Sequence, residues 1–398
     1  MFDDFTVFLI LIVILAALIR DDLLFTVVYL FAGAFLLGRW WSRRALRGVY
    51  FRRSMTTHAF LGEEVPVRLE IHNTSLLPVV WMTVQDLLPV ELVRSRTQNQ
   101  TNVVLSLGPK EKTALDYTLL TRKRGCYQVG PLVASSGDLL GLGGEDRCET
   151  SADVLTVYPK IIQFAHFNLP SFSPMGNLRH NQPLFEDPTR VLSKRDYVAG
   201  DSLRRVDWKA TAILGRLQVK QFEPSIALET ALFLNLNPEE YDWQSRFDAA
   251  ELAIVTAASI ANWVVSKKQT VGLITNGVDP LSEDRIFNPL PPRKGKAHLI
   301  RLLEILARVQ TADALPFLEL IRLHYLNCSW GTTLVMLTGK VDDELLDGLF
   351  PLRQAGLNLV LIQLGQAAQV KQTKEKANYF HIPYYNIRNE LDLDFWRK

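Results

Sequence analysis

The chain has 398 residues, of which 48% are hydrophobic, and its formal net charge is +2 at pH 7. This length is sufficient for two to three domains with separate cores. The near-neutral charge excludes the overall basic surface of a nucleic-acid-binding protein. The three cysteines, Cys126, Cys148 and Cys328, are too few and too scattered for a disulfide framework or a C-x-x-C metal site.

Two apolar runs open the chain. Residues 5–19 and 23–38 are uncharged, and the polar turn Arg20-Asp21-Asp22 separates them. Each run is slightly shorter than the ~20 residues that span a bilayer, yet two such runs around a tight turn predict a transmembrane helical hairpin. A signal peptide is the alternative. It is disfavoured because the N-terminus has Asp3 and Asp4 in place of a basic region, and because no small-residue cleavage site follows.

The charges beside the second run predict the orientation of this anchor. Positive charge marks the cytoplasmic side of a membrane protein. We therefore expect residues 1–53 to form a two-helix anchor in the bacterial inner (cytoplasmic) membrane, with a basic flank and the soluble domains in the cytoplasm. A Cys126–Cys148 bridge would need an extracytoplasmic domain and is not expected. The basic flank contains Arg39, Arg43, Arg44, Arg47, Arg52 and Arg53, with no acid among them.

Residues 54–160 have the pattern of an all-β module. Apolar and polar residues alternate with period 2 over 65–72, and further strand patterns follow at 79–84, 101–107 and 112–120. Turn residues recur at short intervals, which is typical of a β-sandwich. The glycine-rich segment Gly141–Gly144 lacks the Lys-Ser/Thr ending and the helix of a phosphate-binding loop, so we interpret it as a turn.

Residues 161–223 are interpreted as a connecting loop that ends in a dense charged and aromatic segment. Gly200-Asp201 indicates a turn. We expect Gly200–Lys209 to clamp the β module to the following domain, with Trp208 buried and Arg204 paired to Asp196, Asp201, Asp207 or Glu223. The alternative is a ligand-binding or catalytic cluster. The residues of this signature are Tyr197, Gly200, Asp201, Arg204, Asp207, Trp208 and Lys209.

Residues 224–398 alternate between strand and helix patterns. Buried strands are expected at 230–236, 270–275, 332–338, 358–364 and 384–387, and helices at 245–265, 297–309 and 342–350. This alternation predicts an α/β domain with a mostly parallel sheet and helices on both faces.

The signature carries a family resemblance. Tyr197-x-x-Gly200-Asp201-x-x-Arg204-x-x-Asp207-Trp208-Lys209-x-x-Ala212 resembles the signature of the bacterial and archaeal family called domain of unknown function 58. Arg124-Gly-x-Tyr127-x-x-Gly130-Pro131 and the segment 138–142 extend it upstream. The resemblance implies that 224–398 is a von Willebrand factor type A-like module. It also implies a MoxR-type AAA ATPase as partner and, as a second partner, a transglutaminase-like membrane protein.

Modules of the von Willebrand type often bind a divalent cation where the first strand ends in Asp-x-Ser-x-Ser. The matching positions here are Asn235, Asn237 and Glu239, so the leading carboxylate is absent. A hard cation would bind less tightly without that charge. The resemblance therefore implies a degenerate site, and we expect no metal and no cofactor.

The sequence offers no recognisable catalytic motif. The seven histidines are scattered, and neither a nucleophile elbow nor a dinucleotide fingerprint is present. We therefore favour a non-enzymatic, membrane-anchored scaffold or adaptor that binds other proteins. The alternative is an enzyme that acts on a phosphorylated or cell-envelope substrate through Gly200–Lys209.

Overall fold

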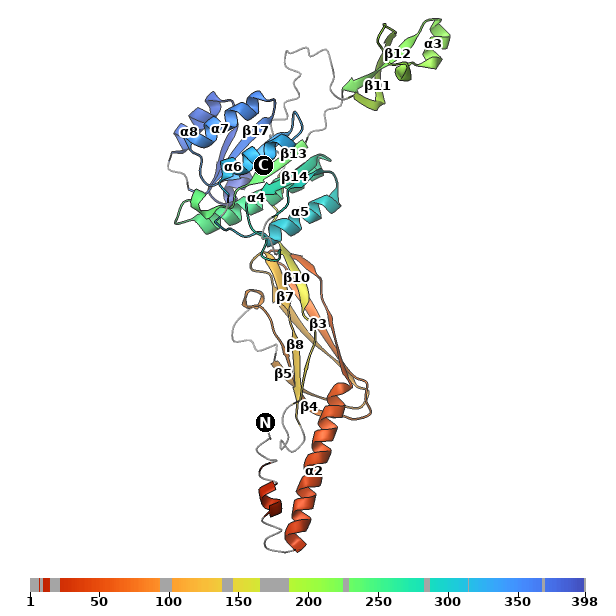
Figure 1. Cartoon of the computed structure of the whole chain (residues 1–398), viewed down its shortest axis with the longest axis vertical. Coiled ribbons are helices and arrows are strands. Elements are labelled where there is room, and N and C mark those ends of the chain that lie inside the picture. Colours follow the sequence, from red (N-terminus) through yellow and green to blue (C-terminus); the bar gives the residue numbers. More distant parts are fainter. Residues whose placement is uncertain are drawn as a thin grey trace. The chain divides into compact units, whose positions relative to one another are not determined.

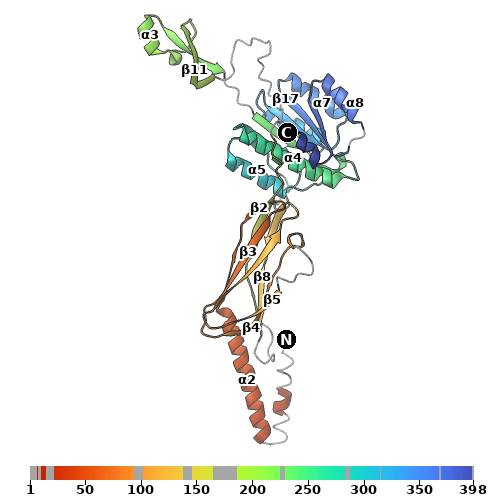
Figure 2. The same cartoon turned by 180° about the vertical axis from the view of Figure 1, so that it is seen from behind.

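The computed structural model describes residues 7, 10–14, 22–93, 102–137, 146–164, 186–224, 229–282, 287–313, 315–366 and 369–396. The chain forms two compact units, drawn from two sides in Figures 1 and 2. The first unit comprises Met1–Lys160 with Leu306–Arg308, and the second comprises Ile161–Ile305 with Val309–Lys398. The architecture combines β-sheets and α/β layers, as the sequence predicts at that level.

Helix α2 (Asp22–Arg47) contains the second apolar run, and its apolar stretch Phe25–Gly38 is shorter than a full membrane span. Among the described residues, one helix has the length and hydropathy of a span, Arg246–Ser266, and 72% of its apolar window is buried inside the protein. That helix is therefore a core helix. Most of residues 5–19 lie outside the described part, so the transmembrane hairpin stays a prediction.

The end of α2 belongs to the β unit. Ala45 and Leu46 are buried in a core with Val49, and the indole Nε1 of Trp41 donates a hydrogen bond to the carbonyl oxygen of Pro78 at 3.0 Å. The basic flank of the predicted anchor also ends earlier than expected, because β1 begins at Val49.

The β unit consists of three sheets, ordered β1-β3-β6, β2-β10-β7 and β5-β4-β8-β9. Within them β10 and β2 run parallel, whereas the other described pairs are antiparallel. The strands are β1 (Val49–Ser54), β2 (His58–Phe60), β3 (Glu64–Asn73), β4 (Val79–Asp86), β5 (Asn102–Leu107), β6 (Lys112–Leu120), β7 (Gly125–Val129), β8 (Leu132–Ser136), β9 (Asp146–Glu149) and β10 (Asp153–Tyr158).

Strand β3 packs against both of the other sheets of the sandwich. Its apolar residues alternate with exposed ones, so they lie on one face. Val65 and Val67 pack into a core with β2, β7 and β10, whereas Leu69 and Ile71 pack into a second core with β4, β5 and β8. One long strand thus contributes to both cores, and the β1-β3-β6 sheet faces the other two.

A buried polar network joins the three sheets. The guanidinium of Arg53 on β1 pairs with Asp86 (Nη2–Oδ1, 2.6 Å) and with Asp153 (Nη1–Oδ2, 2.6 Å). Tyr117 on β6 donates its hydroxyl hydrogen to Asp86. Gly130, with φ of +104°, lies where a Cβ would come within 3.0 Å of Arg53 Nη2. Arg53 is therefore a core residue of the sandwich, although the sequence grouped it with the membrane-flanking arginines.

The α/β unit contains a six-stranded sheet, ordered β15-β14-β13-β16-β17-β18. All neighbours are parallel except β15, which lies antiparallel at one edge. The strands are β13 (Glu229–Leu234), β14 (Thr270–Thr275), β15 (Leu290–Arg293), β16 (Thr333–Thr338), β17 (Asn358–Leu364) and β18 (Tyr384–Ile387). The central strands are buried throughout, as in parallel sheets covered on both faces.

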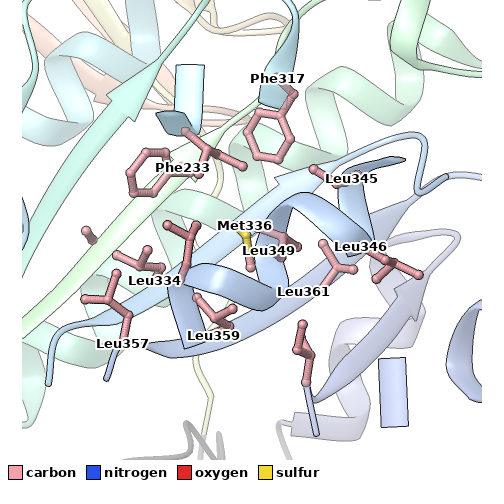
Figure 3. Close-up of a cluster of buried hydrophobic side chains, with 14 of the residues drawn as sticks. Phe233, Phe317, Leu334, Met336, Leu345, Leu346, Leu349, Leu357, Leu359 and Leu361 are labelled. Atoms are coloured by element: carbon pink, nitrogen blue, oxygen red, sulfur yellow. The ribbon is translucent and has the colours of Figure 1, made fainter. Parts of the chain in front are cut away.

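Helices cover both faces of this sheet. On one face, alternate strand residues such as Phe233, Met336 and Leu361 pack against α6, α7 and α8 (Figure 3). Helix α4 contacts β13, β14, β16 and β17 and is buried along most of its length. The helices are α4 (Arg246–Ser266), α5 (Lys296–Arg308), α6 (Phe317–His324), α7 (Asp343–Gln354) and α8 (Val370–Tyr379). The mostly parallel sheet expected for 224–398 is therefore present.

Candidate functional site

The signature lies on a β-hairpin rather than in the loop that the sequence predicts. Strands β11 (Glu186–Asp196) and β12 (Gln218–Pro224) pair antiparallel, with Asp196 opposite Gln218. Between them lie the 3-10 turn η2 (Leu203–Arg205) and the short helix α3 (Trp208–Leu214). The sequence analysis missed β11 because its pattern is interrupted by Pro188 and by register shifts near Val191, which hide the period of two.

Three ion pairs hold the hairpin's acids. The carboxylate of Asp201 receives two bonds from Arg195 (2.6 and 2.7 Å) and one from the backbone amide of Val198 (3.0 Å). The Arg195 hydrogen bonds, followed by the Val198 amide, hold the pKa of Asp201 below its ordinary value. Arg216 Nη1 lies 3.1 Å from Asp196 Oδ2.

Asp207 caps helix α3. Its Oδ1 accepts the backbone amide hydrogen of Ala210 at 3.1 Å, and its Oδ2 lies 2.8 Å from Lys194 Nζ. The hydrogen bond from Lys194, followed by the one from Ala210, lowers the pKa of Asp207. The carboxylates of Asp201 and Asp207 are therefore ionised at neutral pH and hydrogen-bonded, which suits a structural role better than proton donation.

One expectation for the signature is wrong. Trp208 is 66% exposed, not buried, because it is the first residue of a seven-residue helix whose buried side is Ala210. Arg204 is exposed, and Arg216, Arg195 and Lys194 pair with Asp196, Asp201 and Asp207 in its place. The side chain of Glu223, the fourth expected partner of Arg204, lies outside the described residues, so that pairing stays a prediction. Whether the segment clamps two domains stays a prediction.

The hairpin displays an unusual number of apolar side chains for its size. Around the turn at Gly200, which has φ of +109°, large apolar side chains stand 40% to 74% exposed. Exposed polar signature residues such as Lys209 lie among them. We call this set the hairpin surface, and it comprises Val198, Leu203, Trp208, Ile213, Leu214 and Leu217.

A second candidate site lies at the carboxyl ends of β13, β14 and β16, where open α/β sheets usually bind ligands. The amide nitrogen of Asn235 donates to Glu240 Oε2 at 2.7 Å and to Thr338 Oγ1 at 2.9 Å. Its Oδ1 accepts the side-chain amide of Asn276 at 2.9 Å and the backbone amide of Asn237 at 3.0 Å. Both ends of the buried Asn235 side chain are therefore hydrogen-bonded within the protein.

Tyr241 packs over the Asn235 network. Its buried hydroxyl donates to the carbonyl oxygen of Asn235 at 2.6 Å. A Cβ on Gly339 would lie 2.2 Å from the ring of Tyr241, so the ring packs directly on the glycine. Burial, followed by the charge of Glu240, raises the pKa of the Tyr241 hydroxyl above its ordinary value. Tyr241 thus remains neutral and a hydrogen-bond donor.

This arrangement does not fit a cation of the von Willebrand type. A metal ion would need oxygens of Glu240 and Thr338 that face the ion, yet both accept hydrogens from the Asn235 amide. Glu239, the third position of the degenerate motif, is exposed and its backbone amide donates to Asn237 Oδ1. Glu240, Asn276 and Tyr241 complete the network, and the sequence analysis did not single them out.

An aromatic surface borders the closed site. The guanidinium of Arg246 lies 4.3 Å from the ring centroid of Trp243 and 4.9 Å from that of Phe247. Both rings are largely exposed, at 75% and 63%. The exposed acids Glu239, Asp242 and Asp248 lie on the same short segment. We call residues 239–251 the aromatic rim. The Trp243 and Phe247 pair among five acids could have indicated it from sequence.

Residues 193–319, which include most of the signature hairpin and part of the α/β sheet, match the family described as protein of unknown function DUF58. The matched region contains the whole signature from Tyr197 to Lys209, in agreement with the family resemblance of the sequence. The uncharacterized protein YeaD of Bacillus subtilis (strain 168) is 26% identical over 268 residues. That match covers 66% of this chain and 63% of the relative, so the chain spans less than two thirds of YeaD.

Solved structures with partial likeness include the crystal structure of the SpRpn10 VWA domain, with 11% identity and a TM-score of 0.30, covering 42% of this chain and 90% of that one. An aerotolerance-related membrane protein of Bacteroides fragilis NCTC 9343 has 11% identity and a TM-score of 0.29, covering 42% and 94%. The CARDB domain of PF1109 from Pyrococcus furiosus has 15% identity and a TM-score of 0.20, covering 27% and 91%.

Proposed function

We propose that this chain is a membrane-anchored cytoplasmic scaffold that binds other proteins and recruits a MoxR-type AAA ATPase. The observation that carries the proposal is the hairpin surface. Its apolar side chains, Trp208 among them, stay exposed on a two-stranded ribbon whose small core buries Val206, Ala210 and Val219 instead. Contiguous exposed apolar side chains rimmed by charges mark protein-interaction sites.

The chemistry of both candidate sites supports a binding role over an enzymatic one. Asp201 and Asp207 are engaged by Arg195 and Lys194 and held in the ionised form, so neither is poised to donate a proton. At the carboxyl edge, the Asn235 side chain is held by hydrogen bonds to Glu240, Thr338 and Asn276, and the buried Tyr241 hydroxyl bonds to the Asn235 carbonyl oxygen. An enzyme acting on a phosphorylated or cell-envelope substrate through Gly200–Lys209 is the second candidate.

Anchoring in the bacterial inner membrane by two helices is part of the proposal. Helix α2 exposes apolar side chains such as Leu23, Tyr29 and Leu30 along its uncharged stretch, as a lipid-facing helix does. Its last turn carries Arg44 and Arg47, which suit the cytoplasmic leaflet. A transglutaminase-like membrane protein is a second partner of the kind that the family resemblance implies.

The test is recovery of partners from detergent-solubilised membranes with the tagged full chain. The variant Leu203→Ala/Trp208→Ala removes two anchors of the hairpin surface. Its matched control is Leu323→Ala/Leu326→Ala, which removes two equally exposed leucines elsewhere. We expect wild type and control to recover an AAA ATPase, and the hairpin variant to recover at least about tenfold less, since central apolar anchors dominate interface energy.

A different pair of results would favour the alternative that the chain is an enzyme. If no ATPase is recovered by any version, while a phosphorylated envelope compound is consumed by the wild type and not by Asp207→Asn, the scaffold proposal is wrong.

A further inference from the structure

We infer that the hairpin surface of one copy of this chain docks on the aromatic rim of a second copy. The inference rests on the proposed function, because it takes the hairpin surface to be a protein-binding site. It goes further by naming the occupant. Each of the two surfaces exposes a tryptophan to solvent, Trp208 or Trp243, and would be stabilised by covering it.

The part of the hairpin that carries the hairpin surface is basic. Residues 194–220 contain seven Lys or Arg and three Asp, a net charge of +4. The three acids, Asp196, Asp201 and Asp207, are each paired inside the hairpin, so their charge is already compensated. Arg204 and Lys209 flank Leu203 and Trp208 in the sequence and are exposed. The apolar surface is therefore bordered by cations.

The aromatic rim is acidic. Residues 239–251 contain five Asp or Glu and one Arg, a net charge of −4. Glu240 is engaged by Asn235 and by the Phe317 amide, which leaves four acids against one arginine. That arginine, Arg246, lies against the rings of Trp243 and Phe247. Glu239 and Asp248 are exposed on either side of the aromatic pair in the sequence. The rim thus offers exposed rings bordered by anions.

These two surfaces complement each other in charge and in polarity pattern. Opposite potentials orient and select partners, while buried aromatic side chains supply most of the affinity. A contact between two different patches on identical chains is heterologous, so after one contact the first copy keeps its rim free and the second copy keeps its hairpin free. Such a contact extends into a ring or an open row of copies, which is a suitable geometry for a scaffold.

The experiment uses purified full-length chains in detergent, carrying two different affinity tags. The hairpin variant is Arg204→Glu/Lys209→Glu and the rim variant is Glu239→Lys/Asp248→Lys. None of these four side chains forms an ion pair with another residue in the described part of the chain, so each variant should fold, and thermal unfolding checks this. The matched control is Lys371→Glu/Lys374→Glu, two exposed lysines on α8.

We expect wild-type copies and control copies to co-purify across tags. Each variant should co-purify with itself at least about tenfold less, because the changed surface loses its net charge and its introduced side chains face charges of the same sign on the partner copy. Mixing the hairpin variant with the rim variant should restore co-purification, because the introduced glutamates of the hairpin then face the introduced lysines of the rim. Association through the membrane helices would give a background that the charge changes do not alter.

Three results would overturn the inference. Wild-type copies do not co-purify beyond the background, or the variants co-purify like wild type, or the mixture of variants stays apart. The last result is also what a hairpin docked on its own chain would give. Because no ATPase is present in this assay, each of these failures is separate from failure to recover an ATPase from membranes. A final pair, Trp208→Ala and Trp243→Ala, should each weaken co-purification without any charge change.

Discussion

A single amide group decides the chemistry of the carboxyl edge. Asn235 has the size of aspartate, but its nitrogen donates hydrogens to Glu240 and Thr338, where a carboxylate would repel the first of them. A neutral donor therefore occupies the place that a cation would take between two oxygens. The amide also explains why this site can be buried, because both of its ends are hydrogen-bonded.

Replacing Asn235 by aspartate should convert this site into one that needs a cation. In Asn235→Asp a second carboxylate would face Glu240 in a buried position, which costs roughly 3–5 kcal/mol of stability when no charge compensates it. We expect its melting temperature to fall in EDTA and to recover with Mn²⁺ or Mg²⁺. Thermal unfolding with and without metal measures both effects.

Asn235→Ala is the matched control, since it loses the hydrogen bonds without gaining a ligand. It should melt lower than wild type and be indifferent to metal. A wild-type protein that is itself stabilised by micromolar Mn²⁺ would show that the amide network opens to admit a cation, contrary to our expectation.

In the β unit, Arg53 is likewise a buried polar residue whose hydrogen bonds hold several strands together. Its guanidinium and the carboxylate of Asp86 are almost fully buried, at 5% and 3% exposed. We expect Arg53→Ala to reduce the free energy of unfolding by roughly 3–5 kcal/mol, because Asp86 would be left as an unpaired buried charge. The exposed pair Arg68–Asp116, 3.9 Å apart, provides the control.

Arg68→Ala should cost under about 1 kcal/mol, as exposed ion pairs do. Denaturant unfolding of both variants makes the comparison. Equal losses for Arg53→Ala and Arg68→Ala would mean that the buried network does not hold the sandwich together.

At the scale of elements, the sequence predicts those that carry a regular apolar pattern. The central strands of the α/β sheet contain short apolar runs such as 334–337, and such runs need no tertiary information to be recognised. Strand β11 has no such run, because its residues are largely charged or polar and its register shifts near Val191. It is a strand only because β12 pairs with it.

Trp208 shows a second limit. Size and apolarity favour burial only where a second layer of structure can cover the side chain. A two-stranded ribbon with a seven-residue helix offers little such cover, so Trp208 and Ile213 remain exposed. The aromatic rim could not be predicted for the same reason. The sequence does not show that its rings stay uncovered beside a site that forms only when the sheet folds.

The internal order of the hairpin should depend on Asp207 and not on Arg204. Asp207→Ala removes the cap of α3 and the partner of Lys194, so the amide of Ala210 should exchange faster with solvent. Arg204→Ala, which breaks no ion pair among the described residues, should leave exchange unchanged. Hydrogen exchange read by mass spectrometry tests this in the full chain.

The same exchange measurement should show a dependence on pH. The pKa values of Asp201 and Asp207 are lowered in the folded hairpin, so their contribution is present above the ordinary aspartate pKa, about 4, and is lost as the pH falls through the lower folded values. Protection of the hairpin amides that grows on acidification would contradict this assignment.

For the whole molecule, the main open prediction is its orientation in the membrane. Arg52 and Arg53 lie in β1, so the basic flank that can set topology reduces to Arg39, Arg43, Arg44 and Arg47. That flank still exceeds the charge of the Arg20–Asp22 turn. A fluorescent protein fused after Lys398 should fluoresce, and alkaline phosphatase at the same place should be inactive.

An active phosphatase fusion would reverse the orientation. A fusion within residues 20–22 should give the opposite pattern, and it serves as the internal comparison for the same chain.

The amide network at Asn235 determines whether a metal ion can regulate the neighbouring surface. A surface that assembles around a metal ion can be switched by the concentration of that ion. Here the loops at the carboxyl edge are fixed by Asn235, Asn276 and Tyr241, which neither titrate near neutral pH nor depend on a dissolved species. The aromatic rim therefore keeps one conformation whatever the metal concentration. If the rim binds a second copy as inferred, that contact should be insensitive to EDTA and to added Mn²⁺ or Mg²⁺.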